Sequence, residues 1–69
     1  MTLAIELEQE DDGRWIAEID ELDGVLVYGD TKEEAIRNVK TLALRVSADR
    51  LENGENLPQQ VESLIFQAA

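Results

Sequence analysis

The segment from Tyr28 to Ala35 reads YGDTKEEA, and it separates a strand-like part of the chain from its one long helical pattern. Thr31 and Glu34 stand three residues apart, which is the spacing of a capping box. We expect the Thr31 oxygen to accept a hydrogen bond from the backbone N–H of Glu34, and the Glu34 carboxylate to reach back to the N–H of Thr31. Gly29 allows the backbone to turn sharply without a Cβ clash. The segment therefore predicts strands before this junction and a helix after it.

Three short segments before the junction have the patterns of β-strands. Residues 2–9 alternate apolar and polar side chains, as a half-buried strand does. The Asp12-Gly13 pair that follows predicts a hairpin turn into a second strand at residues 14–19. After an acidic turn at residues 20–24, the short apolar run at residues 25–28 is bounded by glycines and predicts a third strand.

The pattern after the junction predicts a helix from Lys32 to about Asn53, with Gly54 as the residue that ends it. Apolar residues recur at the helical period and form the face that we expect to pack on the sheet: Ala35, Ile36, Val39, Leu42, Ala43 and Val46.

A second apolar stripe, formed by Leu44, Ala48 and Leu51, lies off that face. A helix that buries one side has no use for such a stripe, so either the C-terminal segment or another subunit must cover it. A chain of 69 residues without cysteine has a small core and no disulfides, which favours the subunit. The stripe therefore predicts a homo-oligomer with these three residues at its interface.

The C-terminal part is predicted to return to the sheet. Pro58 prevents the long helix from continuing. The apolar run within residues 61–67 predicts a final strand that is buried on both faces, and a right-handed crossover if it pairs in parallel with the first strand. The predicted fold class is thus α+β: one domain, residues 1–69, built as a small β-β-β-α-β layer with the helix packed on one face of the sheet.

The chain is strongly acidic, with a net charge of −10. Residues 1–23 hold nine acidic side chains and a single basic one, a net charge of −8. Such a surface repels phosphate backbones, so we expect no direct binding to nucleic acid. It suits a basic protein partner, although solubility alone would also account for it. No apolar run is long enough to span a membrane and the N-terminus lacks a signal peptide, so the prediction is a cytoplasmic protein that does not contact membranes.

The sequence offers few groups for catalysis. It contains no histidine and no cysteine, which removes the imidazole base, the most common metal ligand and the thiol nucleophile. Carboxylates could in principle gather around Mg²⁺ or Ca²⁺, but the spacing of the turn acids matches no EF-hand loop; these acids are Asp11, Asp12, Asp20, Glu21 and Asp23. We therefore expect no enzyme activity, no metal site and no cofactor.

Several short motifs occur together in an order that resembles the HicB antitoxin family. They are the hairpin DGRWIAE at residues 12–18, the turn LDG at residues 22–24, and GDT followed by EEA within residues 29–35. The resemblance covers about residues 3–54. It implies a partial ribonuclease-H-like fold with three antiparallel strands, a helix and a returning strand. It also implies a protein that binds and neutralises a small basic toxin that cleaves mRNA.

The sequence departs from the family pattern in ways that limit what the resemblance implies. Two prolines of the family loop are replaced by Asp20 and Asp23, and Val25 stands where a small residue or cysteine is common. The chain ends at Ala69, which leaves no room for the DNA-binding domain of longer members, so operator binding is not implied. The alternative function is an orphan module that only associates with itself.

The residues predicted to bind a basic partner are the exposed acids of the two turns, with one aromatic side chain as an anchor. They are Glu10, Asp11, Asp12, Asp20, Glu21, Asp23 and Tyr28.

Overall fold

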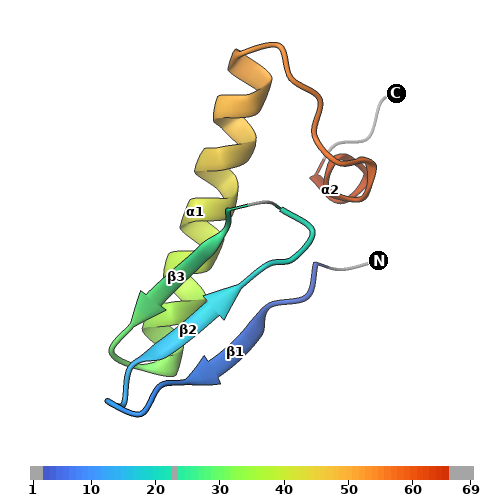
Figure 1. Ribbon diagram of the computed structural model, residues 1–69. Coiled ribbons are helices and arrows are strands. Elements are labelled where there is room, and N and C mark those ends of the chain that lie inside the picture. Colours follow the sequence, from blue (N-terminus) through green and yellow to red (C-terminus); the bar gives the residue numbers. More distant parts are fainter. Residues whose placement is uncertain (1–2, 23, 66–69) are drawn as a thin grey trace.

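The computed structural model describes residues 3–22 and 24–65 (Figure 1). Three strands, β1 (Glu6–Gln9), β2 (Trp15–Glu18) and β3 (Leu26–Gly29), form an antiparallel sheet in the order β1-β2-β3. A long helix, α1 (Lys32–Glu52), packs on one face of the sheet, and a short helix, α2 (Gln59–Ile65), follows it. The protein is thus a small α+β fold, as predicted, with a three-stranded sheet followed by a long helix.

The hairpin between β1 and β2 forms where the Asp-Gly pair predicted it. The Gly13 N–H donates to the Glu10 carbonyl at 2.9 Å. Gly13 has a φ of 91°, at which a residue with an L side chain would be strained. The Asp12 carboxylate accepts from the backbone N–H of Arg14 at 3.0 Å and from its Nε at 2.8 Å. These local bonds set the register in which Gln9 lies opposite Trp15.

Helix α1 begins at the predicted cap. The Glu34 N–H donates to the Thr31 Oγ1 at 3.1 Å, and Thr31 is extended, with φ −125° and ψ 162°. The reciprocal bond differs from the prediction, because the Glu34 carboxylate accepts from the N–H of Asp30, at 3.4 Å, instead of that of Thr31. The Glu34 side chain thus reaches one residue further back than in a standard capping box.

Helix α1 also ends where predicted. Asn53 is the C-cap and Gly54, with a φ of 76°, is the next residue. The Gly54 N–H donates to the Leu51 carbonyl at 3.1 Å and the Glu55 N–H to the Arg50 carbonyl at 2.8 Å. These two bonds are those of a Schellman motif, which satisfies carbonyls that the end of a helix leaves without partners.

The core lies between the inner face of the sheet and α1, and it continues beyond the strands. A four-residue strand is about 13 Å long, whereas a helix of 21 residues is about 31 Å long. The C-terminal half of α1 therefore extends past the sheet (Figure 1). The connection between β2 and β3 packs in this region with Ile19, Leu22 and Val25 buried, and so do Leu57 and Val61.

The predicted final strand at residues 61–67 is wrong, because α2 occupies Gln59–Ile65 and residues 66–67 lie outside the described residues. The Glu62 N–H donates to the Pro58 carbonyl at 3.0 Å, a bond of the first helical turn. Val61 in this turn is 0% exposed, and Leu57, two residues before the helix, is 5% exposed, so both side chains pack in the core. No crossover strand therefore joins the sheet within residues 3–22 and 24–65.

Candidate protein-binding surfaces

The face of the sheet that points away from α1 carries a mixed apolar and acidic surface, which we call the outer sheet face. Residues that lie opposite one another in an antiparallel register point to the same side. Ala17 is fully buried beneath α1, so its neighbours along the strand point outward. The outer sheet face consists of two rows across the strands: Glu8, Ile16 and Tyr28, and Glu6, Glu18 and Leu26.

The apolar side chains of the outer sheet face lie toward its β3 edge, on β2 and β3. Leu26 and Tyr28 are each 45% exposed, and Ile16 lies between them and the acids of β1. The Arg14 guanidinium carbon lies 4.7 Å from the centroid of the Tyr28 ring, within the range of a cation–π contact. The outer sheet face thus has aromatic and aliphatic contact area toward β3 and carboxylates toward β1, with Glu18 between Glu6 and Leu26.

Three of these carboxylates gather at one end of the face. Oxygen atoms of Glu6, Glu18 and Asp20 lie within 4.8 Å of one another. The Asp20 charge, and a hydrogen bond between the two carboxyls, raise the pKa of Glu6 above its ordinary value; burial and the Glu18 and Glu21 charges add to this. Sequence reasoning missed this cluster because Glu6 and Asp20 are brought together only by the pairing of β1 with β2.

The cluster offers a cation few protein ligands. Calcium in proteins takes about six to eight oxygen ligands, and magnesium about six. Glu6 and Asp20 are exposed and Glu18 is half-buried. The three carboxylates repel one another, and a basic partner would relieve this repulsion.

The Glu6 carboxyl predicts a pH dependence of stability. The pKa of Glu6 is higher in the folded chain than in the unfolded chain, so its protonation stabilises the fold. This contribution to stability is fully present below the unfolded pKa and is lost as pH rises through the folded pKa. We expect Glu6→Gln to have a higher melting temperature than the wild type at pH 7, and the two to converge near pH 4, measured by circular dichroism.

The effect of Glu6 must be separated from that of Asp12, because the stability contributed by Asp12 changes with pH in the opposite direction. Hydrogen bonds from the Arg14 backbone N–H and side chain lower the pKa of Asp12, so its stabilising charge is lost as pH falls. Asp12 is the same in both proteins, so the difference between their melting curves isolates Glu6. A melting temperature of Glu6→Gln at or below that of the wild type at pH 7 would contradict the repulsion.

The acids predicted to bind a partner do not form one patch. Glu10, Asp11 and Asp12 lie at the turn between β1 and β2, whereas Asp20 and Glu21 lie on the connection at the opposite end of β2 (Figure 1). The five residue steps from Arg14 to Ile19 span about 17 Å. Tyr28 is on the outer sheet face between the two groups, and Asp23 lies outside the described residues.

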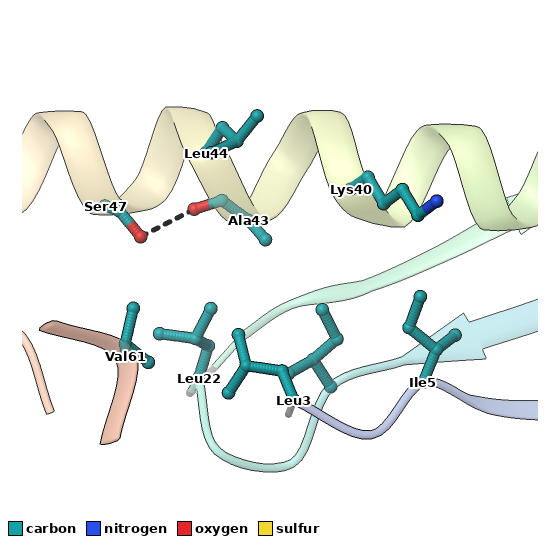
Figure 2. Close-up of a pocket in the computed structure, with 9 residues that line it drawn as sticks. Leu3, Ile5, Leu22, Lys40, Ala43, Leu44, Ser47 and Val61 are labelled. Atoms are coloured by element: carbon teal, nitrogen blue, oxygen red, sulfur yellow. Dashed lines mark hydrogen bonds between the residues drawn. The ribbon is translucent and has the colours of Figure 1, made fainter. Parts of the chain in front are cut away.

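A second candidate surface is an apolar groove of 320 Å³ between α1 and the segments below it (Figure 2). Figure 2 shows Ala43 and Ser47 of α1 facing Leu3, Leu22 and Val61. Leu44 also borders the groove, although most of its side chain projects away from these residues. The Ser47 hydroxyl donates to the Ala43 carbonyl at 2.8 Å, so this polar group is already bonded, and Lys40 is a second polar residue that lines the groove. Sequence reasoning did not find this groove, because its walls come from four separate parts of the chain.

The stripe formed by Leu44, Ala48 and Leu51 is exposed, as its position off the core face predicted. Leu44 is 62% exposed and Leu51 46%, and Ala48 is exposed as well. The C-terminal segment was one of the two expected covers for this stripe, but α2 leaves the three residues exposed. Its role as an oligomer interface is a proposal.

Comparison with protein-family models, with curated proteins and with solved structures returns no match to this chain. Among the described residues, no helix is both long enough and apolar enough to cross a membrane. The features from which a function can be inferred are therefore the outer sheet face, the groove and the exposed stripe of α1.

Proposed function

We propose that this chain is a HicB-like, antitoxin-type protein that binds and neutralises a small basic ribonuclease toxin through the outer sheet face. The observation that carries the proposal is the composition of this face: Ile16, Leu26 and Tyr28 form an apolar patch that reaches the β3 edge, and carboxylates lie beside it on β1, β2 and the connection after β2. These carboxylates belong to Glu6, Glu8, Glu18 and Asp20. In this proposal the chain acts by binding and is not an enzyme.

This arrangement suits a basic protein for two physical reasons. Aromatic and aliphatic side chains in the centre of an interface supply most of the binding free energy when they are desolvated. The neighbouring acids attract a positively charged partner and speed its association, an effect that weakens as salt rises. Relief of the repulsion around Glu6 would add to the gain on binding, since a basic side chain near the cluster stabilises the ionised carboxylates.

The fold supports the resemblance in part. Three antiparallel strands followed by a helix on one face agree with the partial ribonuclease-H-like fold of the HicB family, whereas α2 stands where that family has a returning strand. The proposal places the binding surface on the shared part. A toxin that cleaves mRNA acts where mRNA is translated, so the proposal also implies a cytoplasmic site of action.

The test compares two triple variants that change the net charge equally. One removes acids of the outer sheet face and its edge: Glu8→Gln, Glu18→Gln and Asp20→Asn. The other removes exposed acids elsewhere: Asp49→Asn, Glu55→Gln and Glu62→Gln. Tagged wild-type protein is used to capture partners from its native cells at low salt, and a captured small basic protein is then assayed for RNA cleavage with each variant added.

We expect wild-type protein and the Asp49/Glu55/Glu62 variant to inhibit the cleavage, and the Glu8/Glu18/Asp20 variant to need about tenfold more protein for the same inhibition. Equal inhibition by both triple variants would show that net charge alone acts, which contradicts a role of the outer sheet face. Capture of no basic protein, or of one whose RNA cleavage the wild type does not inhibit, would overturn the antitoxin proposal.

The alternative function, an orphan module that associates only with itself, is favoured by a different observation. The exposed leucines of α1 lie on another side of the molecule from the outer sheet face. Self-association through α1 is compatible with a partner on the sheet, so the two proposals can be tested separately.

A further inference from the structure

We infer that two copies of this chain pair through their α1 helices in an antiparallel orientation, with Leu44, Ala48 and Leu51 in the contact. The inference does not depend on the proposed function, because α1 and the outer sheet face lie on opposite sides of the sheet. It names the occupant of the exposed stripe, a second copy of this chain, and it predicts the relative direction of the two helices.

The spacing of the exposed residues is that of a two-helix contact. Thr41, Leu44, Ala48 and Leu51 are separated by three, four and three residues, as alternate seam positions of a coiled coil are, and all four are exposed. Ala48 has a short side chain and lies between the two leucines, so it allows a second helix to approach closely. Leu44 also stands at the rim of the apolar groove, so the contact adjoins further apolar surface.

The charges beside this seam select the direction of the pair. Arg45 and Glu52 are seven residues apart, so both lie on the same flank of the seam, and both are exposed. In an antiparallel pair centred near Ala48, the same flanks of the two helices meet. Arg45 of each copy then lies opposite Glu52 of the other, which gives two ion pairs of opposite charge.

A parallel pair would bring like charges together. In that orientation the two opposite flanks meet, and a residue on one flank contacts the residue five positions further along on the partner helix. Lys40 of each copy would then face Arg45 of the other, and both side chains are positively charged. Charge complementarity therefore favours the antiparallel pair, and it does so in a chain whose overall charge of −10 opposes association.

We expect the dimer to be weak. Three short apolar contacts on each helix bury less than the interfaces of about 1,200 Å² or more that are typical of stable complexes. Association should therefore depend on concentration and should be measured at about 0.15 M salt, where charges more than about 8 Å apart are largely screened.

The test is sedimentation equilibrium on the full chain up to about 1 mM, with single and mixed charge-reversal variants. Arg45→Glu places two glutamates together at each contact, and Glu52→Arg places two arginines together. We expect each variant alone to raise the dissociation constant about tenfold or more. An equimolar mixture of the two variants restores both opposite-charge contacts, so we expect a heterodimer with an affinity close to that of the wild type.

Two further variants control for charge and for folding. Asp49→Arg changes an exposed acid of α1 to the same extent as Glu52→Arg but off the seam, and it should leave the dissociation constant within about threefold of the wild type. Leu44→Glu should abolish the dimer, while its thermal melt followed by circular dichroism stays within a few degrees, since the side chain is 62% exposed.

Three results would overturn the inference. A wild type that stays monomeric at all concentrations would show that the stripe is not an interface. Association that is unchanged in Arg45→Glu, Glu52→Arg and Leu44→Glu would place the contact on another surface. Weakened association of the single variants without recovery in the mixture would exclude the antiparallel pairing.

Discussion

Replacing Leu22 with alanine is expected to lower the free energy of unfolding by about 2–5 kcal/mol, the usual effect of such a truncation in a protein core. Leu22 is 2% exposed although acidic residues precede it in the connection between β2 and β3. Its backbone N–H donates to the Ile19 carbonyl at 3.2 Å, and its own carbonyl accepts from the Val25 N–H at 3.2 Å. The side chain is thus held against the part of α1 that extends past the sheet.

This loss is large in relation to the whole protein. A domain of this size has a total stability of roughly 3–10 kcal/mol, so Leu22→Ala should leave much of the chain unfolded at 37 °C. Urea unfolding followed by far-ultraviolet circular dichroism measures the effect. Leu26→Ala is the matched control, because the same atoms are removed from a side chain that is 45% exposed, and we expect it to lose about 1 kcal/mol or less. Equal losses in the two variants would contradict the burial of Leu22.

Replacing Gly29 with alanine is expected to destabilise the fold by about 3 kcal/mol, because the new methyl group has no space. A Cβ on Gly29 would meet the backbone N of Ala35, and it would lie 2.8 Å from the Ala35 Cα and 3.0 Å from the Glu34 carbonyl carbon. These are main-chain atoms of the first turn of α1, so the helix would have to move away from β3. The role of Gly29 is therefore close approach of the helix, in place of the sharp turn expected from the sequence.

Gly54→Ala separates this effect from the general cost of replacing a glycine. Gly54 has a φ of 76°, but nothing lies within 4 Å of the position of its Cβ. We expect this variant to lose about 1 kcal/mol through backbone strain alone. In the same urea unfolding measurement, Gly29→Ala should lose clearly more free energy of unfolding than Gly54→Ala. The reverse order would contradict the close approach of α1 to β3 at Gly29.

The two candidate contact surfaces have different physical characters, and this determines how they can be separated by experiment. The outer sheet face presents acids beside an apolar patch at the β3 edge, so binding there should weaken steeply with salt. The seam of α1 presents leucines flanked by two basic residues, Lys40 and Arg45, and one acidic residue, Glu52, so pairing there depends on the local order of charges. A charge change on one surface should leave the affinity of the other almost unchanged, since distant sites are close to additive.

The sequence by itself determined the local parts of this protein. The hairpin at Asp12-Gly13, the cap at Thr31 and the end of α1 at Gly54 all follow from hydrogen bonds that join residues no more than five positions apart. The exposed stripe of α1 also followed from the sequence, because the helical period alone places Leu44 and Leu51 off the buried side.

Only the tertiary structure decided the rest, because it depends on residues that are far apart in the chain. The apolar run after Pro58 fits a strand as well as a helix, and the choice of α2 follows from the space beneath α1 that Leu57 and Val61 fill. The burial of Leu22 depends on the length by which α1 exceeds the sheet. The carboxylate cluster of Glu6 and Asp20 depends on strand register, since charge counts along a sequence do not show which acids become neighbours in space.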